Sequence, residues 1–313
     1  MNKKTKIVFM GTPLFAVESL KAIHSLPSVD ISAVVSTPNK PAGRGLKITS
    51  SDVSKYAELN NLKLLQPKSL KSKLFLKQLK EIDTDIIVVV AFKKLPKEVW
   101  SIPRFGTFNL HASLLPDYRG AAPINWAIIN GEKETGVTTF LINEEIDAGK
   151  ILLQKKLTIS ENDNVGDIYN KLMSIGSNLV VETIEKLISN AIKPIEQPMA
   201  INYKLAPKIF PVNCAIDWEL SVNKIHDLVR GLSPHPAAWT YFKINNQIKK
   251  VKILKGAYTS IDSVYEKPEL EIINKDLIVK NKTGVYKIIA LQIEGKSMVL
   301  ADNFINGHKN LTL

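Results

Sequence analysis

The feature that most restricts the fold is an alternation of short apolar runs with helical segments across the first two-thirds of the chain. The clearest run, Asp85–Ala91, is apolar at every position after its first residue, as in a strand buried on both faces of a parallel sheet. Ile7–Met10 and Ile31–Val35 are similar runs, and apolar residues recur at helical spacing over Leu14–Ile23. Strands separated by helices predict an open, mostly parallel α/β sheet with helices on both faces.

The same pattern continues toward the middle of the chain. Gly106–Leu110 and Gly136–Ile142 predict further strands. A long helix is predicted over Val165–Ile188, where Asn164 stands at the N-cap position and Asp167 follows three residues later, as in a capping box. The sheet is therefore expected to extend well beyond residue 100.

Near residue 191 the pattern changes. Three prolines fall between residues 191 and 208, which predicts a linker over 191–208 between a domain of residues 1–190 and one of residues 209–313. After one helix predicted at Ser221–Leu232, short strand-like runs are typical of a small β-barrel. These runs are Trp239–Phe242, Lys250–Leu254, Glu271–Ile273, Leu277–Val279, Tyr286–Leu291 and Met298–Leu300.

Composition excludes several kinds of protein. Cys214 is the single cysteine, so an intrachain disulfide and a cysteine-cluster metal site are both excluded. The formal net charge of +12, from 42 Lys and Arg against 30 Asp and Glu, favours a polyanionic partner, with nucleic acid first. A lysine-rich solvated surface is the alternative, and composition alone does not separate the two.

The N-terminus carries no targeting signal that we can identify. The apolar run Ile7–Met10 is followed at once by Gly11-Thr12-Pro13, whereas a signal peptide needs a longer apolar region and a small-residue cleavage site. No stretch approaches about 20 uninterrupted apolar residues, the length that spans a bilayer. We therefore expect a cytoplasmic protein that does not insert into a membrane.

A basic segment lies between residues 37 and 47. Two prolines and two glycines predict that it has no regular structure, and its three cations are Lys40, Arg44 and Lys47. A basic loop of this kind is suited to contacting phosphates. Taken alone, an ordinary surface connection is the better interpretation, because most loops of this kind only connect.

Asn109 and His111 are the first candidates for chemistry. They stand two residues apart at the end of a predicted strand, so both side chains share one face, and the carboxyl edge of such a sheet opens on the ligand crevice. An amide and an imidazole there can polarise a carbonyl and stabilise an oxyanion. Asp147, after the Gly136–Ile142 strand, can orient the histidine or move its proton. The alternatives are a turn-capping asparagine, a buried structural histidine and a turn aspartate.

Other enzyme signatures are missing. Gly11-Thr12-Pro13 is not the Gly-x-Gly-x-x-Gly of dinucleotide-binding folds, and the chain has neither a phosphate-binding P-loop nor a Gly-x-Ser-x-Gly elbow. The five histidines show no metal-ligand spacing. No metal is expected.

In combination, these motifs resemble the formyltransferase family. The central one is Asn109-x-His111-x-Ser113-Leu114-Leu115-Pro116-x-x-Arg119-Gly120 with Asp147 downstream. Further motifs resemble the members that act on methionyl-tRNA, and together they cover essentially the whole chain. They are Met10-Gly11-Thr12-Pro13-x-Phe15-Ala16, Pro41-Ala42-Gly43-Arg44-Gly45, Gln66-Pro67, Ile216-Asp217-Trp218 and Pro234-x-Pro236.

The resemblance implies a Rossmann-like formyltransferase domain followed by an OB-like, tRNA-binding barrel. The implied reaction moves the formyl group of 10-formyltetrahydrofolate to the α-amino group of methionyl-initiator tRNA. Asn109 and His111 would stabilise the oxyanion of the tetrahedral intermediate, and Asp147 would hold the histidine tautomer and assist proton removal.

The resemblance also implies the binding residues. The loop Ser113, Leu114, Leu115 and Pro116 would line the folate site, and Lys40, Arg44 and Lys47 would contact the tRNA acceptor end. The expected partners are therefore the tRNA and the folate, and the protein is expected to be a monomer. Two departures from the family pattern are Phe92-Lys93, where an aromatic-Gly pair is common, and Pro207 near the second domain. Lys93 is expected to alter the rim of the folate pocket.

Two other functions remain open at this point. A sibling formyltransferase would act on a nucleotide, a sugar amine or water, although glycinamide ribonucleotide transformylases lack a basic second domain. A non-catalytic RNA-binding protein could keep the same fold, but the intact Asn109, His111 and Asp147 set argues against it.

Overall fold

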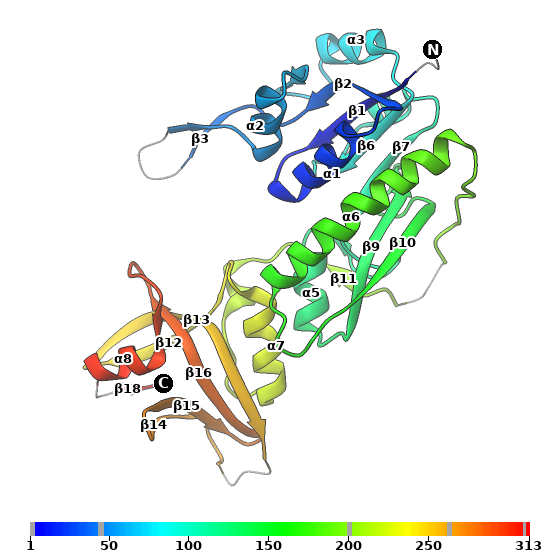
Figure 1. The fold of residues 1–313 in the computed structure, drawn as a ribbon. Helices are drawn as coiled ribbons and strands as arrows, with labels where there is room; N and C mark the ends of the chain where they lie inside the picture. The colour runs from blue at the N-terminus through cyan, green and yellow to red at the C-terminus, as the bar shows by residue number, and fades with distance from the viewer. Residues whose placement is uncertain (1–3, 43–46, 199–201, 262–264, 309–310) are drawn as a thin grey trace. The chain divides into compact units, whose positions relative to one another are not determined.

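The chain folds into two compact units, each built from several segments. The structure is a computed structural model that describes residues 4–42, 47–198, 202–261, 265–308 and 311–313 (Figure 1). The first unit comprises residues 1–120, 135–157 and 169–205, and the second comprises residues 121–134, 158–168 and 206–313. Two short strands, β8 (Arg119–Gly120) and β11 (Leu205–Ala206), lie where the chain passes between these segments.

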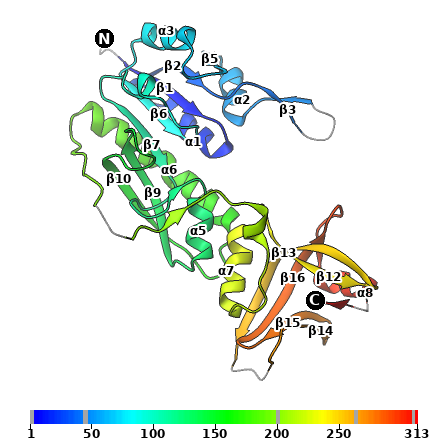
Figure 2. The same ribbon diagram turned by 180° about the vertical axis from the view of Figure 1, so that it is seen from behind.

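A seven-stranded sheet forms the centre of the first unit, with β5 and β10 at its edges (Figure 2). The strands from β5 to β7 pair in parallel, and β9 runs antiparallel to β7. The prediction of an open, mostly parallel α/β sheet is confirmed, and the sheet gains an antiparallel edge. In spatial order the strands are β10 (Ile151–Thr158), β9 (Glu134–Leu141), β7 (Thr107–His111), β6 (Ile86–Val90), β1 (Thr5–Gly11), β2 (Val29–Val35) and β5 (Leu64–Leu65).

Helices cover both faces of this sheet. One face packs on α3 (Lys73–Ile82) and α4 (Lys97–Trp100) through a cluster of buried side chains from β1, β2 and β6. On the other face, α6 (Val165–Ile188) approaches β7 at Gly176, where an added Cβ would lie 2.8 Å from a Leu110 methyl carbon. The first unit also contains α1 (Leu14–His24) and α2 (Asp52–Leu59).

The start of α6 confirms the predicted capping box. The Asn164 side-chain oxygen accepts from the backbone N–H groups of Gly166 and Asp167, at 2.7 and 3.1 Å, and the Asp167 carboxylate accepts from the Asn164 N–H at 3.0 Å. These contacts satisfy amide groups that have no partner within the helix. The helix start was readable from sequence because both of its cap residues are local.

The expectation that residues 37–47 lack regular structure is wrong for part of that segment. β3 (Lys40–Ala42) and β4 (Lys47–Thr49) form an antiparallel pair in which Pro41 lies opposite Ile48. A two-stranded ribbon consists of edge strands only, where a proline without an N–H is tolerated. A proline in this segment therefore did not exclude regular structure, and residues 43–46 lie outside the described residues.

The second unit is built around an antiparallel sheet that is nearly closed into a barrel, as predicted. Its strand order is β14, β15, β16, β13, β12 and β18, with β17 paired to β16, and the two ends β14 and β18 lie close together. The bounds are β12 (Ala238–Ile244), β13 (Gln247–Ser260), β14 (Glu269–Ile273), β15 (Asp276–Asn281), β16 (Gly284–Ile293), β17 (Val299–Leu300) and β18 (Leu311–Thr312).

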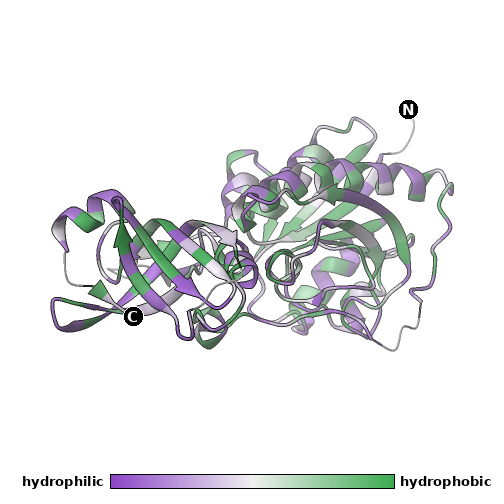
Figure 3. Ribbon diagram, turned by 90° about the horizontal axis from the view of Figure 1, so that it is seen from below, coloured by the Kyte–Doolittle hydropathy of each residue, from purple (hydrophilic) through white to green (hydrophobic). Residues whose placement is uncertain are grey.

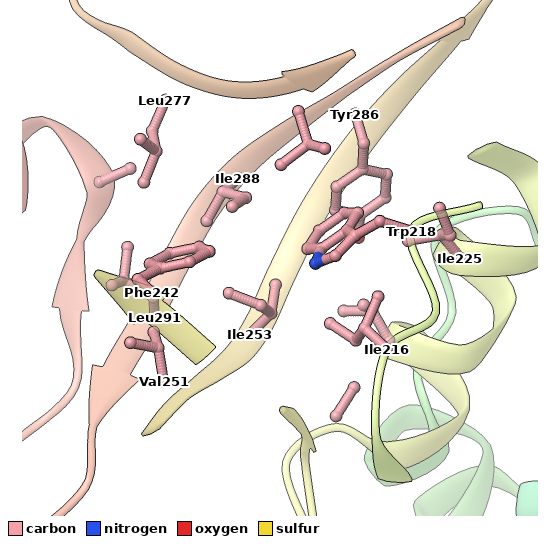
Figure 4. Packing of buried hydrophobic residues seen from close by; sticks show 14 of the residues in the cluster. Ile216, Trp218, Ile225, Phe242, Val251, Ile253, Leu277, Tyr286, Ile288 and Leu291 are labelled. Carbon is pink, nitrogen blue, oxygen red and sulfur yellow. The ribbon is translucent and has the colours of Figure 1, made fainter. Parts of the chain in front are cut away.

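A hydrophobic core fills this barrel-like unit. Figure 4 shows Phe242, Ile253 and Ile288 from three strands, with Trp218 lying beside Tyr286. Its helices are α5 (Pro123–Ile129), α7 (Val222–Leu232), α8 (Ala301–Gly307) and a 3₁₀ turn (Pro211–Cys214). α5 packs against α7, where the Asn125 amide donates to the Gly231 carbonyl at 2.8 Å.

Hydropathy follows this layered packing. Green and purple alternate along the helices in Figure 3, as expected when one face of a helix is buried and the other is solvated. Across the described residues, the search for helices with the length and apolar character needed to cross a bilayer finds none.

Candidate active site

His111 occupies the last position of β7, at the carboxyl edge of the parallel strands. Its side chain is only 6% exposed. The Nε2 atom lies 2.8 Å from the Tyr118 carbonyl oxygen, which can only accept, so Nε2 carries a proton in this contact. The second ring nitrogen, Nδ1, is therefore the one left to take up or release a proton.

The Asp147 carboxylate faces that second nitrogen. Its Oδ2 atom lies 3.8 Å from His111 Nδ1 and accepts from the Gly120 N–H at 3.0 Å. The Asp147 backbone has a left-handed φ of +53°, a conformation that aspartate and asparagine adopt more readily than most residues. Two residues predicted to act together, 36 positions apart in the sequence, thus meet at one point.

A buried glutamine that the sequence interpretation did not single out fixes the loop that carries Asp147. The Gln197 side chain is 9% exposed, and its Nε2 atom donates to the carbonyls of Asp147 and Gly149 at 2.9 and 2.8 Å. Its Oε1 atom accepts from Arg119 at 2.5 and 3.1 Å. The segment expected to form a linker therefore supports the site at its beginning, and Ile195 also bridges to Ile151 of β10. Prolines nearby suggested a linker and gave no sign of this contact.

Asn109 shares a sheet face with His111. Asn109 lies beside Val89 of β6 and opposite Phe140 of β9, and the Phe140 ring contacts the His111 ring edge to face at 6.5 Å between centroids. Directly paired residues present their side chains to the same side of a sheet. The Asn109 side chain is half-buried and makes no hydrogen bond within the part of the chain that the structure describes. Its amide is thus available to a ligand.

The loop predicted to line the folate site is firmly held by protein contacts. Ser113 is fully buried and its hydroxyl donates to the Asp117 carbonyl at 2.7 Å, while Leu115 is also buried. Leu114 and Pro116 are half-buried and present the accessible apolar surface of this loop. Their backbone is pinned because Thr138 and Gln154 bond to the main chain of the loop.

Two of the three basic residues expected at a nucleic-acid interface lie on the β3–β4 ribbon. Lys40 is exposed at the start of β3 and Lys47 begins β4. Arg44 falls outside the described residues. None of the His, Cys, Asp and Glu side chains within the described ranges form a group of three or more suited to a metal ion.

A second basic surface, which the sequence interpretation did not identify, lies on β12 and β13. Alternate residues of β12 are buried, so Trp239, Tyr241 and Lys243 face outward, and register places Lys252 and Lys250 beside the two aromatic residues. The Lys250 Nζ atom lies 4.3 Å from the centre of the Trp239 ring, and Tyr241 is 53% exposed. We call these five residues the aromatic–basic face. Alternating Trp, Tyr and Lys was visible in sequence, but only the register shows that they share one surface.

Comparison with family models matches both parts of the chain. Residues 5–184 match the model described as formyl transferase, and residues 208–309 match the model described as formyl transferase, C-terminal domain. The methionyl-tRNA formyltransferase of Bacteroides thetaiotaomicron is 44% identical over 314 residues, covering 97% of this chain and 96% of the relative. That of Flavobacterium johnsoniae is 43% identical over 305 residues, with the same coverage.

Solved structures share the fold at lower identity. An N-formyltransferase from Helicobacter canadensis, in complex with folinic acid and dTDP-3-aminofucose, has a TM-score of 0.68 and 24% identity over 91% of this chain and 98% of that chain. HypX from Aquifex aeolicus, in complex with tetrahydrofolic acid, has a TM-score of 0.61 and 18% identity over 97% of this chain and 47% of that chain.

Proposed function

This chain belongs to the methionyl-tRNA formyltransferase family, and from that premise we propose that it transfers the formyl group of 10-formyltetrahydrofolate to the α-amino group of methionyl-initiator tRNA. One observation carries the proposal. At the carboxyl edge of β7, the Asp147 carboxylate lies 3.8 Å from His111 Nδ1, and Asn109 lies on the same face of the sheet as His111. The net charge of +12 fits a tRNA substrate. Residues 1–190 would hold the catalytic site, 191–208 would connect, and 209–313 would bind tRNA.

The residues divide the chemistry as follows. The amine nitrogen forms a bond to the formyl carbon, and the bond from that carbon to N10 of the folate breaks. The amine loses one proton and N10 gains one, so tetrahydrofolate leaves as the neutral amine. The Asn109 amide, which has no hydrogen-bond partner among the described residues, donates to the formyl oxygen as negative charge develops there. His111 Nδ1, with its proton balanced by the Asp147 carboxylate, supplies the second donor or carries the proton away.

The donor fits the surfaces that the loop offers. Leu114 and Pro116 of the proposed folate loop present apolar surface. The buried side chains of Ser113 and Leu115 anchor that loop to the protein interior. Folate would supply the one-carbon unit when bound, and no metal ion is needed in this scheme.

A single assay tests the function. Purified protein is mixed with labelled 10-formyltetrahydrofolate and with methionyl-initiator tRNA, an amino sugar, an amino-bearing nucleotide or no acceptor. Formyl transfer to each acceptor and free formate are measured. Transfer that depends on charged tRNA supports the proposal. Formate release without tRNA would indicate a hydrolase, transfer only to an amino sugar or nucleotide would indicate a sibling enzyme, and no reaction would indicate a binding protein.

We propose that Lys40, Arg44 and Lys47 contact the acceptor end of the tRNA. Replacing Arg44 with alanine is expected to raise the KM for methionyl-tRNA about tenfold or more, because a charge-assisted phosphate contact is lost. The KM for the folate donor should stay within about twofold. Steady-state kinetics with each substrate varied in turn make the measurement, and equal changes in both KM values would contradict the assignment.

We also propose that the aromatic–basic face binds the tRNA backbone and an unpaired base. Replacing Trp239 with alanine is expected to weaken tRNA binding by about 1–3 kcal/mol, the value of one base stacked on an aromatic ring. Trp239→Phe is the matched control, because it keeps a ring while losing the indole N–H that donates to the Pro211 carbonyl. Filter binding at several salt concentrations measures both variants. Weak binding by the phenylalanine variant as well would point to the hydrogen bond and away from stacking.

Gln197 is proposed as a positioning residue. Replacing it with alanine removes both donors to the Asp147 loop and leaves the Arg119 guanidinium without its acceptor. Misplacement of a catalytic group by about 1 Å can cost about 100-fold, so we expect kcat to fall about 10- to 100-fold while both KM values change little. Gln197→Glu keeps the acceptor for Arg119 and tests the donors alone. An unchanged kcat in both variants would contradict the role.

A further inference from the structure

A groove lined with lysines lies in the first unit, beyond the residues discussed above. Its volume is about 660 Å³, within the range of small-molecule sites. The loop after β5 supplies Lys68 and Lys71, and the loop after β6 with the start of α4 supplies Lys93, Lys94 and Lys97. Glu98 is the one acidic residue among the described residues of the lining, against five lysines, so the groove is strongly positive.

Most of this charge is not neutralised by the protein. Lys68, Lys71, Lys93 and Lys94 are exposed, and none has a carboxylate within ion-pair distance in the ranges that the structure describes. Lys97 pairs with Glu144 at 2.9 Å. The pKa of the Glu144 carboxyl is lowered because Lys97 donates a hydrogen bond to it, and nearby Lys94 lowers it further. The four unpaired lysines repel one another, which favours an anion between them.

Both loops are anchored, so the charges stand in a preformed arrangement. Leu70 and Leu95 of the groove lining are buried in the core under α3 and α4. A ligand that binds there therefore does not have to order the loops, which lowers the entropic cost of binding.

The groove opens at the same sheet edge as the proposed active site. β6 is the neighbour of β7, with Val89 beside Asn109, and the groove loop begins just after β6 ends at Val90. The Lys97–Glu144 ion pair ties α4 to the loop that carries Asp147 three residues later. A molecule that reacts at Asn109 can thus extend along the strand ends toward the lysines.

We propose that this groove binds the γ-linked oligoglutamate tail of the folate donor. The inference rests on the proposed function and extends it to the form of donor that the protein prefers. Each added γ-glutamyl unit brings one more carboxylate, and a flexible row of carboxylates suits ammonium groups that act as point charges. Of the residues that the structure describes, no aromatic side chain belongs to the groove lining. These residues therefore offer no stacking surface of the kind that unpaired nucleotides use and that the aromatic–basic face supplies.

The test compares donors carrying one and five glutamates. For the unchanged protein we expect the KM of the pentaglutamate donor to be about tenfold lower, with a preference that fades as salt is raised toward about 1 M, where the Debye length falls to about 3 Å. The variant Lys68→Gln/Lys71→Gln/Lys94→Gln should lose the preference, bringing the ratio of the two KM values near 1. It leaves Lys93 and Lys97 in place because these contact Phe92 and Glu144.

A matched variant controls for the loss of three charges. Lys63, Lys80 and Lys155 are exposed lysines of the same unit without an ion pair among the described residues, and they lie outside the groove lining. Replacing all three with glutamine should leave the preference for pentaglutamate intact. Loss of preference in this control as well would assign the effect to net charge and overturn the proposal.

Other outcomes are equally decisive. An unchanged protein that does not distinguish the donors, or a groove variant whose KM rises for tRNA and for neither donor, would overturn the proposal, and the second result would assign the groove to the tRNA. If the unchanged protein transfers no formyl group at all, the proposed function fails instead. Calorimetric binding of the two donors to the same proteins then still decides whether the groove holds the tail.

Discussion

Replacing His111 with glutamine is expected to lower the kcat of formyl transfer by at least about 1,000-fold, because general acid–base catalysis and a well-placed oxyanion donor each contribute about 100-fold or more. Glutamine is the replacement that best isolates the role of His111 Nδ1. Its terminal N–H can still donate to the Tyr118 carbonyl, as His111 Nε2 does at 2.8 Å, so the buried packing survives. It provides nothing in place of Nδ1, the nitrogen that faces Asp147.

The measurement is single-turnover transfer from labelled donor to charged tRNA, together with tRNA binding by the same variant. Binding should stay within about twofold of the unchanged protein, because His111 is buried and the replacement leaves the lysines and arginine proposed to contact phosphates in place. His111→Asn is the companion variant, since its amide replaces a donor at the Nδ1 position without being able to titrate. If asparagine restores the rate that glutamine loses, donation rather than proton transfer is the role of the histidine. Transfer at an unchanged rate in both variants would exclude His111 from catalysis.

Local signals explain which elements were predictable. The strand at Ile86–Val90 is buried at every position. Its sequence is therefore a continuous apolar run, which is typical of a central strand of a parallel sheet. The α6 start was predicted because Asn164 and Asp167 form a reciprocal cap within four residues. The strand β10 was not predicted, because exposed Gln and Lys residues interrupt its apolar pattern, as is common at the edge of a sheet.

Long-range contacts explain what the sequence could not provide. Asn109 and His111 are a local motif, and period-2 geometry alone placed them on one face. Their relation to Asp147, by contrast, stayed one of two interpretations until the family resemblance favoured it, because it depends on β9 pairing antiparallel with β7. Gln197 was missed for the same reason: its partners, Asp147, Gly149 and Arg119, lie 48 to 78 residues away. Only the folded chain shows that a segment rich in proline holds the loop that carries Asp147.

Replacing Asp147 with asparagine is expected to lower kcat about 100- to 10,000-fold while both KM values stay within a few-fold, since the lost charge matters most when the imidazole becomes protonated. Asparagine is the matched replacement because it tolerates the left-handed φ of +53° at this position and retains an oxygen that can accept from the Gly120 N–H. Asp147→Ala combines the loss of charge with backbone strain, so its larger effect would be harder to interpret.

The decisive comparison is with the double variant His111→Gln/Asp147→Asn. If the carboxylate acts through the histidine, which its Oδ2 atom faces at 3.8 Å, removing both groups should cost little more than removing His111 alone, because residues that act as a unit are not additive. Independent action predicts that the two losses multiply. That result would mean that Asp147 takes the amine proton directly. His111 and Asp147 would then each act on the substrate, and the carboxylate would not serve to orient the imidazole 3.8 Å away.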